Sequence, residues 1–390
     1  MHIALVSLGY PPYVFGGVET YVSLLSKELS RNQVTTTVIA GWPGKHVSRE
    51  KVDAYLNVVR LPLLDFPIRA VWFQLMNRGT IAKLLENVDV VHSNSPQTSL
   101  INSKMKNGRS LVVTMHGSPE AISAYFKVAA VPGTLSLGDY LYLMEFPLIN
   151  NFYMKDLSQS DHLIYVAQHV KNEAAQYARG KNFEVESKSE VIYAGIDYRQ
   201  ISRVETEPHD RGELELAFVG RLFWPKGIMY AMQAVDCLVN EMGEESTRLH
   251  VFGAGPLKQW ILRFSKKKSL ASNVMVHGQV KRNEMIKMLQ ATRVAVLPSL
   301  YEGCPYTVLE ANAMGLPVVS FDFPWSREFI TNGLNGYLSR PFDAFKLAEN
   351  VLKAGRLNGS HIKAQAGRYD VRISAKKTID LYQRLLATYP

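Results

Sequence analysis

Short apolar runs rich in β-branched residues alternate along the whole chain with longer segments of helical periodicity. This alternation is typical of βαβ units, in which helices cover both faces of a parallel sheet. In the first half the predicted strands are 3–8, 35–40, 88–91, 111–115 and 163–166. In the second half they are 214–219, 249–252, 274–276, 294–297 and 317–320. With an amphipathic helix predicted over 18–30, the pattern indicates an α/β fold with doubly wound sheets.

The length of 390 residues favours two domains, because a single core rarely grows past ~250 residues. The segment 194–211 is polar and acidic and contains Pro208, so it is the predicted linker. We place the boundary near Asp197, which gives domains 1–196 and 197–371. After residue 341 two or three helices and no further strand are predicted, and the terminal helix, about 372–390, is free to dock elsewhere.

The net charge of +9 lies mostly in the second half of the chain. Residues up to Gly195 include 18 basic and 16 acidic side chains, and the remainder 26 and 19. A basic half suits an anionic ligand such as a nucleotide diphosphate, or an anionic membrane surface. Nucleic acid is not an expected partner, because the basic residues are scattered and no motif that reads DNA or RNA is present.

The cysteines and the apolar segments are the features from which the cellular location is predicted. Cys237 and Cys304 lie far apart, which predicts neither a disulfide framework nor a metal cluster and favours the cytoplasm. The first residues do not resemble a secretion signal, and no uncharged apolar stretch reaches the ~18 residues that span a bilayer. Segment 140–157 is rich in aromatics and leucine but contains Pro147 and charges. A core helix is favoured there, and peripheral contact with the inner face of the membrane stays an open alternative.

The strongest candidate for chemistry is the pair Glu302 and Glu310, which follows the predicted strand 294–297. Gly303 and Pro305 indicate a turn, and Pro305 is the predicted first helical residue. Free N–H groups at such a helix start can hold a diphosphate. A carboxylate on the helix can accept two ribose hydroxyls, and one on the loop can reach a hexose hydroxyl. The alternative is that both glutamates are ordinary surface acids beside a turn.

A second candidate is the loop 220–227, which follows the predicted strand 214–219 and contains Arg221 and Lys226. Charge-assisted contacts with phosphate oxygens are strong, and neutralising a leaving diphosphate is the task that a sugar transfer without metal requires. Two cations in one loop are more often solvated when they stand alone. Their position at the same sheet edge as the glutamate loop favours the phosphate interpretation.

Weaker signals also follow predicted strands. Gly16 and Gly17 open the first helix but lack the third glycine of the dinucleotide fingerprint. His116 stands at the end of a strand, where most histidines are structural or solvated. The glycine turns around Gly255 and before Val280 can frame a base and ribose, or can be turns only.

Taken in order, these motifs resemble the retaining glycosyltransferase family 4, which has the two-domain GT-B fold. The resemblance covers nearly the whole chain. The motifs that carry it are Gly16 to Glu19, His116-Gly117, Gly195 to Asp197, Val219 to Gly227, Gly253 to Pro256, Glu302 to Glu310 and Asn332 to Gly336. The family's closing helix corresponds to 374–386 here and implies that the terminal helix packs on the first domain.

The resemblance assigns a role to each candidate residue. Gly16 and Gly17 would approach the donor phosphates, Arg221 and Lys226 would hold the diphosphate, and Glu310 would hold the ribose. Glu302 would bind a hydroxyl of the transferred sugar, and His116 would lie near its anomeric centre. The remaining predicted contacts with the donor come from Gly255, Val280, Gly303, Cys304, Pro305 and Tyr306. The segment 321–328 departs from the glycine-rich loop of many members, which puts the identity of the donor sugar in doubt.

These roles predict transfer of a hexose from a nucleoside-diphosphate sugar to a glycan, lipid-linked or small acceptor. No nucleophile is evident for the far face of the sugar, so a front-face path with retention is favoured. No Asp-x-Asp motif is visible, and we expect neither a divalent metal nor another cofactor. The alternatives are a sugar-nucleotide epimerase of the same fold and a non-catalytic protein that binds sugar nucleotides.

Overall fold

The computed structural model describes residues 1–14, 16–64, 68–95, 109–119, 121, 123–124, 137–181, 183–203 and 214–388, without the side chains of 137–144 and 283. The chain divides into two compact units. Unit 1 comprises Met1–Ser123, Asp139–Gly195 and Val371–Pro390, and unit 2 comprises Ala124–Gly138 and Ile196–Asp370. Of the predicted linker, the part from residue 204 onward lies outside the described residues.

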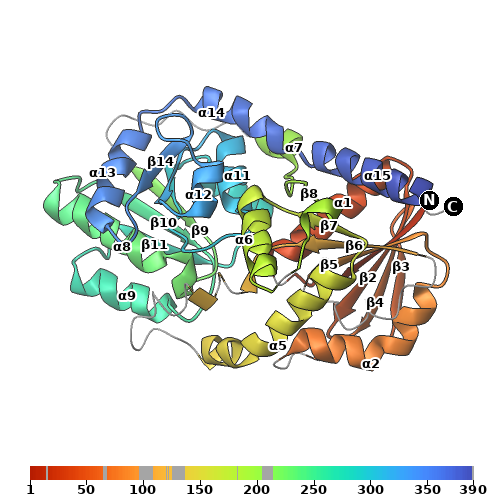
Figure 1. The fold of residues 1–390 in the computed structure, drawn as a ribbon. Coiled ribbons are helices and arrows are strands. Elements are labelled where there is room, and N and C mark those ends of the chain that lie inside the picture. Colours follow the sequence, from red (N-terminus) through yellow and green to blue (C-terminus); the bar gives the residue numbers. More distant parts are fainter. Residues whose placement is uncertain are drawn as a thin grey trace. The chain divides into compact units, whose positions relative to one another are not determined.

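Unit 1 is built on an eight-stranded sheet with the order β3-β4-β2-β1-β5-β6-β7-β8 (Figure 1). Its strands are β1 (His2–Ser7), β2 (Thr35–Trp42), β3 (Ser48–Lys51), β4 (Leu56–Pro62), β5 (Val90–Ser95), β6 (Ser110–Met115), β7 (His162–Tyr165) and β8 (Ser189–Val191). Neighbouring strands are parallel except β3 and β4, which are antiparallel. Because β1, β5 and β6 run side by side in one direction, the loops that follow them begin at one edge of the sheet.

Unit 1 also contains five α-helices among its described residues. They are α1 (Gly17–Arg31), α2 (Arg69–Leu84), α5 (Leu137–Gln159), α6 (Gln168–Arg179) and α15 (Val371–Thr388), with a 3₁₀ turn at Glu186–Lys188. In α1 the buried Tyr21, Val22, Leu25 and Leu29 recur at helical spacing and face the core. The predicted amphipathic helix at 18–30 is therefore confirmed.

Helix α15 follows unit 2 in the chain but packs against α1 in unit 1. At Gly195 a Cβ atom would lie 2.4 Å from the Cα of Val371, so only glycine allows the two segments to approach this closely. Ser374 Oγ donates a hydrogen bond of 2.6 Å to the carbonyl of Tyr193. These contacts attach the terminal helix to the first unit, as the family resemblance implied.

Unit 2 has a six-stranded, wholly parallel sheet with the order β11-β10-β9-β12-β13-β14. Its strands are β9 (Glu215–Val219), β10 (Arg248–Phe252), β11 (Val274–Gly278), β12 (Val294–Val296), β13 (Val318–Phe321) and β14 (Gly336–Ser339). Its helices are α7 (Tyr198–Ser202), α8 (Ile228–Asp236), α9 (Lys258–Lys267), α10 (Arg282–Leu289), α11 (Tyr306–Met314), α12 (Pro324–Phe329), α13 (Ala344–Ala354) and α14 (Gly359–Ala366). Short turns of other helix types lie at Trp224–Lys226, Cys237–Glu241 and Gly367–Tyr369.

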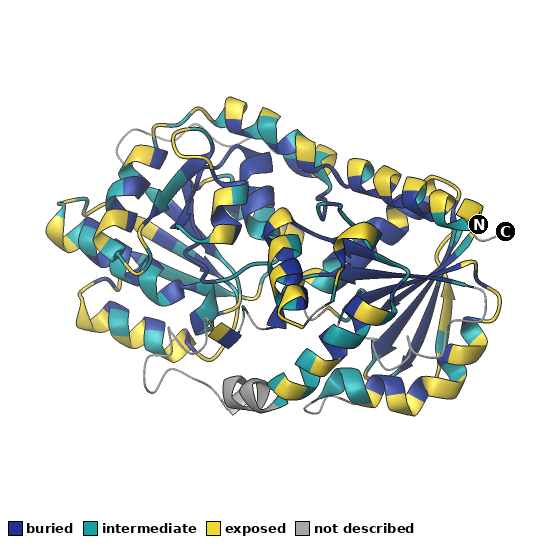
Figure 2. Ribbon diagram, viewed as in Figure 1, coloured by how far each residue is buried: buried dark blue, intermediate teal, exposed yellow. Residues whose placement is uncertain are grey.

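The predicted fold class, two doubly wound α/β domains with largely parallel sheets, is confirmed. Each of the ten predicted strands is present, and most of their apolar residues are buried, except in β11, where all five residues are half-buried (Figure 2). Four strands were not predicted, namely β3, β4, β8 and β14. One detail was wrong: Pro305 precedes α11 as its N-cap and is not its first helical residue.

The aromatic segment 140–157 forms most of α5, with Pro147 inside the helix. Its side chains up to 144 lie outside the described residues, whereas Phe152, Tyr153 and Leu157 are buried. The described part of this segment thus agrees with the prediction of a core helix. Among the described residues, no helix combines the length and the apolar character that crossing a bilayer requires.

Candidate functional site

The two charged loops that the sequence singled out meet in unit 2. Lys226 ends the turn that follows β9, and Glu302 lies in the loop that follows β12, the strand beside β9. Lys226 Nζ donates to both carboxylate oxygens of Glu302, at 2.6 and 2.8 Å. The lysine side chain is 28% exposed and the glutamate 13%. The cation predicted for the diphosphate and the carboxylate predicted for the sugar are therefore ion-paired with each other.

Arg221 behaves differently from Lys226, although both belong to one loop. Its side chain is exposed, and its guanidinium carbon lies 4.7 Å from the centre of the Phe223 ring. Such cation–π contacts at exposed positions are weak, at about 0.5–1 kcal/mol. A stronger anionic partner can therefore replace the ring at little cost.

Glu310, on α11, is the second predicted carboxylate, and it too is paired. Arg282 Nη2, at the start of α10, lies 2.7 Å from Glu310 Oε1, and the glutamate side chain is 12% exposed. Burial raises the pKa of Glu310, and the neighbouring Arg282 counteracts this rise. The sequence did not single out Arg282, because a basic residue in the first turn of a helix does not by itself indicate a functional site.

The loop 303–306 leads into α11 and is less open than predicted. The N–H of Tyr306 donates to the carbonyl of Cys304, and the N–H of Val308 donates to that of Pro305. These two donors are therefore occupied by the protein. Gly303, Cys304 and Tyr306 are half-buried and Pro305 is buried.

The glycine turn after β10 has a packing role. Gly255 has φ +159°, and a Cβ atom there would lie 2.4 Å from the carbonyl oxygen of Leu222. The N–H of Leu222 donates to the carbonyl of Ala254. The absent side chain thus lets the turn lie against the Arg221 loop. Val280, in the loop after β11, is half-buried.

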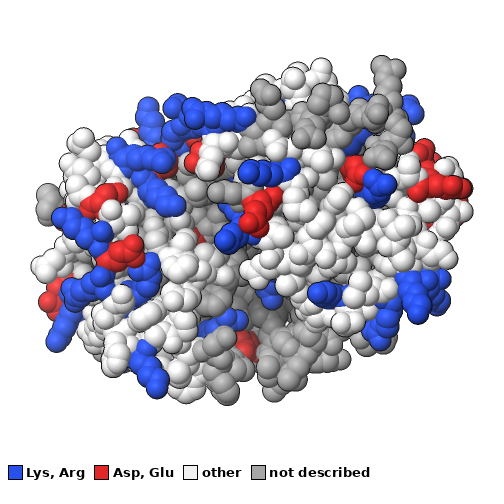
Figure 3. Space-filling model, turned by 180° about the vertical axis from the view of Figure 1, so that it is seen from behind, with Lys and Arg blue, Asp and Glu red and all other residues white. Residues whose placement is uncertain are grey.

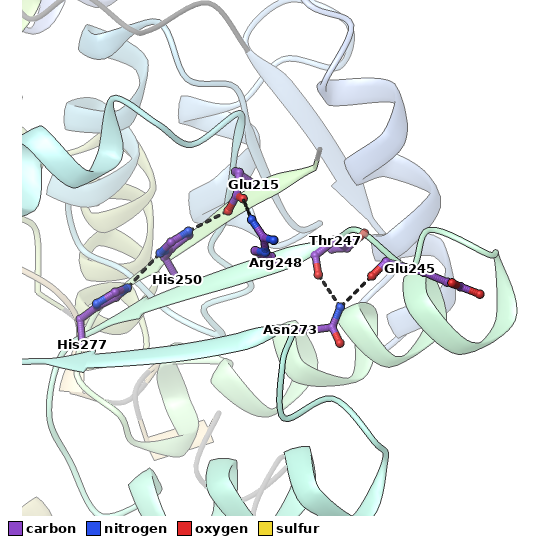
Figure 4. Close-up of polar contacts among 7 residues, drawn as sticks. All are labelled: Glu215, Glu245, Thr247, Arg248, His250, Asn273 and His277. Atoms are coloured by element: carbon purple, nitrogen blue, oxygen red, sulfur yellow. Dashed lines mark hydrogen bonds and ion pairs between the residues drawn. The ribbon is translucent and has the colours of Figure 1, made fainter. Parts of the chain in front are cut away.

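A histidine chain on the sheet face of unit 2 was not predicted (Figure 4). His250 Nε2 lies 2.7 Å from Glu215 Oε2, and His250 Nδ1 lies 2.9 Å from His277 Nε2. With a carboxylate at Glu215, His250 donates from Nε2 and accepts at Nδ1 from His277. Burial, followed by the effect of His250, lowers the pKa of His277.

Three further contacts stabilise this region. Arg248 Nη1 contacts Glu215 at 3.2 Å, and Asn273 Nδ2 donates to the carbonyls of Glu245 and Thr247 (Figure 4). The chain of side chains ends at His277, directly before the loop of Val280. The residues of this chain come from β9, β10 and β11. The only sequence signal for them is that every second residue of a strand lies on the same face of the sheet.

In unit 1, Gly16 and His116 belong to neighbouring segments at one sheet edge. Gly16 is the N-cap of α1, Gly17 is its first residue, and the N–H of Gly16 donates to Glu19 Oε2 at 2.8 Å. Among the described residues, an added Cβ at Gly16 would meet only that oxygen, at 3.9 Å. The described part of the chain therefore leaves space beside Gly16.

His116, directly after β6, is held in one tautomer. Its Nε2 lies 2.8 Å from Asn94 Oδ1, and Asn94 Nδ2 donates to the carbonyl of Val6 at 2.9 Å. Asn94 thus presents its oxygen, so Nε2 of His116 carries the hydrogen and Nδ1 is left as an acceptor. Burial lowers the pKa of His116 to about 3, so the ring is neutral near pH 7.

A buried polar network lies beneath His116. The ring of Tyr21 meets the His116 ring edge-on at 5.0 Å, and Tyr21 Oη lies 3.3 Å from Thr114 Oγ1. The same threonine hydroxyl is 2.5 Å from His92 Nε2, and His92 Nδ1 is 2.5 Å from Tyr382 Oη on α15. Burial, followed by the effect of His116, lowers the pKa of His92 to about 3. The terminal helix therefore reaches the strand that leads to His116.

The charged side chains on one face of the molecule are of mixed sign. Lys and Arg are spread over the face drawn in Figure 3 and are interspersed with Asp and Glu. Within the described ranges, no group of three or more His, Cys, Asp and Glu side chains is arranged to hold a metal ion.

Solved structures share this fold. A sucrose-phosphate synthase from Thermosynechococcus elongatus superimposes with a TM-score of 0.77 over 99% of both chains, at 17% identity. The Anabaena protein HepE, solved with UDP and glucose, superimposes with a TM-score of 0.68 over 98% of this chain and 100% of its own, at 16% identity. Both likenesses describe the fold, because identities this low carry no further assignment.

Sequence comparisons assign the family. The model of Glycosyltransferase Family 4 matches residues 15–200, and that of Glycosyl transferases group 1 matches residues 201–365. A glycogen synthase of Mycobacterium tuberculosis is 25% identical over 371 residues, which cover 90% of this chain and 85% of the relative. The chain belongs to the family-4-like glycosyltransferases of the GT-B fold. The predicted family and fold are thereby confirmed.

Proposed function

We propose that this glycosyltransferase moves a hexose, with retention of configuration, from a nucleoside-diphosphate sugar to a glycan, lipid-linked or small acceptor. The observation that carries the proposal is the double cation–carboxylate arrangement of unit 2, Lys226 with Glu302 and Arg282 with Glu310. Both pairs lie in segments that follow strands of a parallel sheet, where α/β folds bind nucleotides. The UDP and glucose in the Anabaena structure and the name of the mycobacterial relative support a nucleotide-sugar donor and a glycan acceptor.

The diphosphate is proposed to bind at Arg221 and Lys226. Lys226 exchanges the carboxylate of Glu302 for phosphate oxygens, so that the half-buried ammonium group stays paired throughout. Arg221 is exposed and adds a second cation. Glu302, once released, accepts a hydroxyl of the hexose.

Glu310 is proposed to accept the two ribose hydroxyls. A carboxylate has two oxygens that suit such a diol only while it is ionised. Because burial raises the pKa of Glu310 and Arg282 counteracts the rise, the ion pair with Arg282 favours the ionised form. Arg282 thus prepares the carboxylate, a role that the sequence did not suggest.

Transfer is proposed to take place on one face of the sugar. The bond from the anomeric carbon to the diphosphate breaks, the acceptor oxygen bonds to that carbon from the same side, and the departing phosphate takes the acceptor proton. Gly16 and Gly17 are proposed to bind the donor phosphates, because the described residues leave space beside Gly16. Neutral His116 accepts a hydrogen bond from the transferred sugar at Nδ1, and no divalent metal takes part.

The two glutamates provide the test, because they are assigned to different parts of the donor. Glu310→Ala removes a contact made equally in ground and transition states, so it should weaken binding of the free nucleoside diphosphate. Glu302→Ala should not weaken that binding, because it frees Lys226, but it should depress turnover through loss of sugar positioning.

A screen of nucleotide sugars against lipid, protein and small glycan acceptors identifies the substrates, and NMR of the product gives its anomeric configuration. Calorimetry with the matching nucleoside diphosphate then separates the two variants. Glu349→Ala, on the exposed face of α13, is the matched control and should change neither quantity. Equal loss of nucleotide affinity in both site variants, or full activity in both, would contradict the proposal, and an inverted product would exclude retention.

A further inference from the structure

The outer face of α2 in unit 1 exposes several large apolar side chains. Trp72 is 37% exposed, Leu75 52% and Met76 52%, and Leu64, shortly before the helix, is 48% exposed. Residues three and four apart lie on one helix face, so Trp72, Leu75 and Met76 form a continuous stripe. The exposed turns of α2 are visible in Figure 2.

The opposite face of α2 already supplies the packing that holds the helix. Phe73, Gln74, Asn77 and Ile81 are buried, and α2 packs against β4. Asn77 Nδ2 donates 2.9 Å hydrogen bonds to the carbonyls of Pro62 and Phe73. This packing fixes the rotation of α2 about its axis. The stripe therefore points away from the core, and packing within the core does not account for its apolar character.

The charges of α2 indicate what covers the stripe. The helix contains Arg69, Arg78 and Lys83 and no acidic residue, and Arg78 and Lys83 are exposed. A helix that combines an exposed Trp, Leu and Met stripe with cations and no acid suits the interface of an anionic bilayer. There the apolar side chains enter the acyl boundary and the cations meet lipid head groups.

We propose that α2 is a membrane-docking surface that binds anionic phospholipid. The stripe of Trp72, Leu75 and Met76 enters the lipid interface, and Arg78 and Lys83 contact its phosphates. This surface differs from segment 140–157, which the sequence had left open for such contact. The inference goes beyond sugar transfer, and lipid binding can be measured without any donor or acceptor.

Helix α9 of unit 2 offers a matched comparison. It is more basic than α2 in its last turns, where Lys266 and Lys267 are exposed, but Leu262 is its one strongly exposed large apolar side chain. If charge alone attracted the protein to lipid, α9 would bind as well as α2. The apolar stripe predicts that α2 binds instead.

The test is flotation of the full chain with vesicles of phosphatidylcholine alone or mixed with phosphatidylglycerol. Binding is expected only to the mixed vesicles and should weaken with added salt. Arg78→Glu with Lys83→Glu should lower partitioning by about 20-fold or more, since each cation near the surface contributes about fivefold. Leu75→Ser with Met76→Ser should also abolish most binding.

Lys266→Glu with Lys267→Glu, and separately Leu262→Ser, should leave partitioning unchanged. Nucleotide binding by every variant checks that the fold is intact. Failure of the wild type to bind the mixed vesicles would overturn the inference and leave a protein partner for this face. An equal loss of binding from the α9 and α2 charge reversals would overturn it as well.

Discussion

Replacing Lys226 by methionine separates the two partners that this cation is proposed to have, Glu302 in the free protein and a diphosphate in the complex. The variant keeps most of the side-chain volume but removes the ammonium group that pairs with Glu302, whose side chain is 13% exposed. Removing one partner of a fully buried pair costs about 3–5 kcal/mol. Because Lys226 is 28% exposed, water can solvate part of the Glu302 carboxylate in the variant, and we expect a loss of about 1–2 kcal/mol in unfolding free energy.

This loss should lower Tm by about 2–8 °C, since a unit of this size shifts by about 2–4 °C per kcal/mol. Adding Glu302→Gln removes the carboxylate charge as well and should restore most of the stability. It should not restore affinity for the nucleoside diphosphate. A charged hydrogen bond contributes about 1.5–3 kcal/mol, so both the single and the double variant should bind about 10- to 150-fold more weakly than wild type.

Thermal unfolding and calorimetry with the nucleoside diphosphate measure the two effects independently. Lys346→Met with Glu349→Gln is the matched control, because that pair is also 2.6 Å long but its members are 45% and 38% exposed. Such surface pairs contribute under about 1 kcal/mol. Normal nucleotide affinity in the Lys226→Met/Glu302→Gln variant would refute the reasoning, since Lys226 would then serve only Glu302.

Three further outcomes are expected. Transfer should continue at full rate after treatment with EDTA, and an activity that is lost and then restored by manganese would exclude the metal-free proposal. Tyr382→Phe leaves buried His92 Nδ1 without its hydroxyl and should lower the unfolding free energy by about 1–3 kcal/mol. Arg384→Ala, on the same helix but 60% exposed, should cost less than about 1 kcal/mol, and equal losses in urea titrations would contradict the network. Because the pKa of His92 and that of His116 are lowered to about 3, both rings protonate only on unfolding. Stability should therefore fall as pH drops below about 6.5, by up to about 1.4 kcal/mol per pH unit for each histidine, and a flat Tm between pH 6 and 4 would contradict this.

The sequence predicts the strands of this fold where both faces of a strand are buried. Such strands are continuous apolar runs, as in β1 and β13, and a run of this kind cannot be mistaken for a polar loop. Strand β3, with the sequence SREK, is polar because it lies at the edge of the sheet. Strand β4 escapes notice because it contains Arg60, whose charge is compensated by Glu50 at 2.6 Å and by the carbonyl of Pro11. Tertiary partners can thus place a charged residue inside a strand, and no local pattern records them.

The candidate site likewise has a part that the sequence predicts and a part that it does not. Glu302, Lys226 and Arg221 are conspicuous in the sequence because they lie in loops that follow strands of one parallel sheet, where α/β folds bind ligands. The ion pairs are not conspicuous, because they depend on strand order, which places the loop after β9 beside the loop after β12. Arg282 could not be assigned to Glu310 without α10 and α11 in three dimensions.

The network under His116 shows why the order of the chain conceals part of a site. His92 and Tyr382 are 290 positions apart, and each alone reads as a buried aromatic residue in an apolar segment. Helix α15 follows unit 2 in sequence, yet its tyrosine supplies one of the two hydrogen bonds that fix His92, and His92 in turn fixes Thr114 on β6. A terminal helix that only covered apolar surface would need no buried hydroxyl, since a phenylalanine fills the same volume without a polar atom to satisfy. The tyrosine therefore indicates that α15 contributes to the geometry of the strand end at His116 as well as to packing.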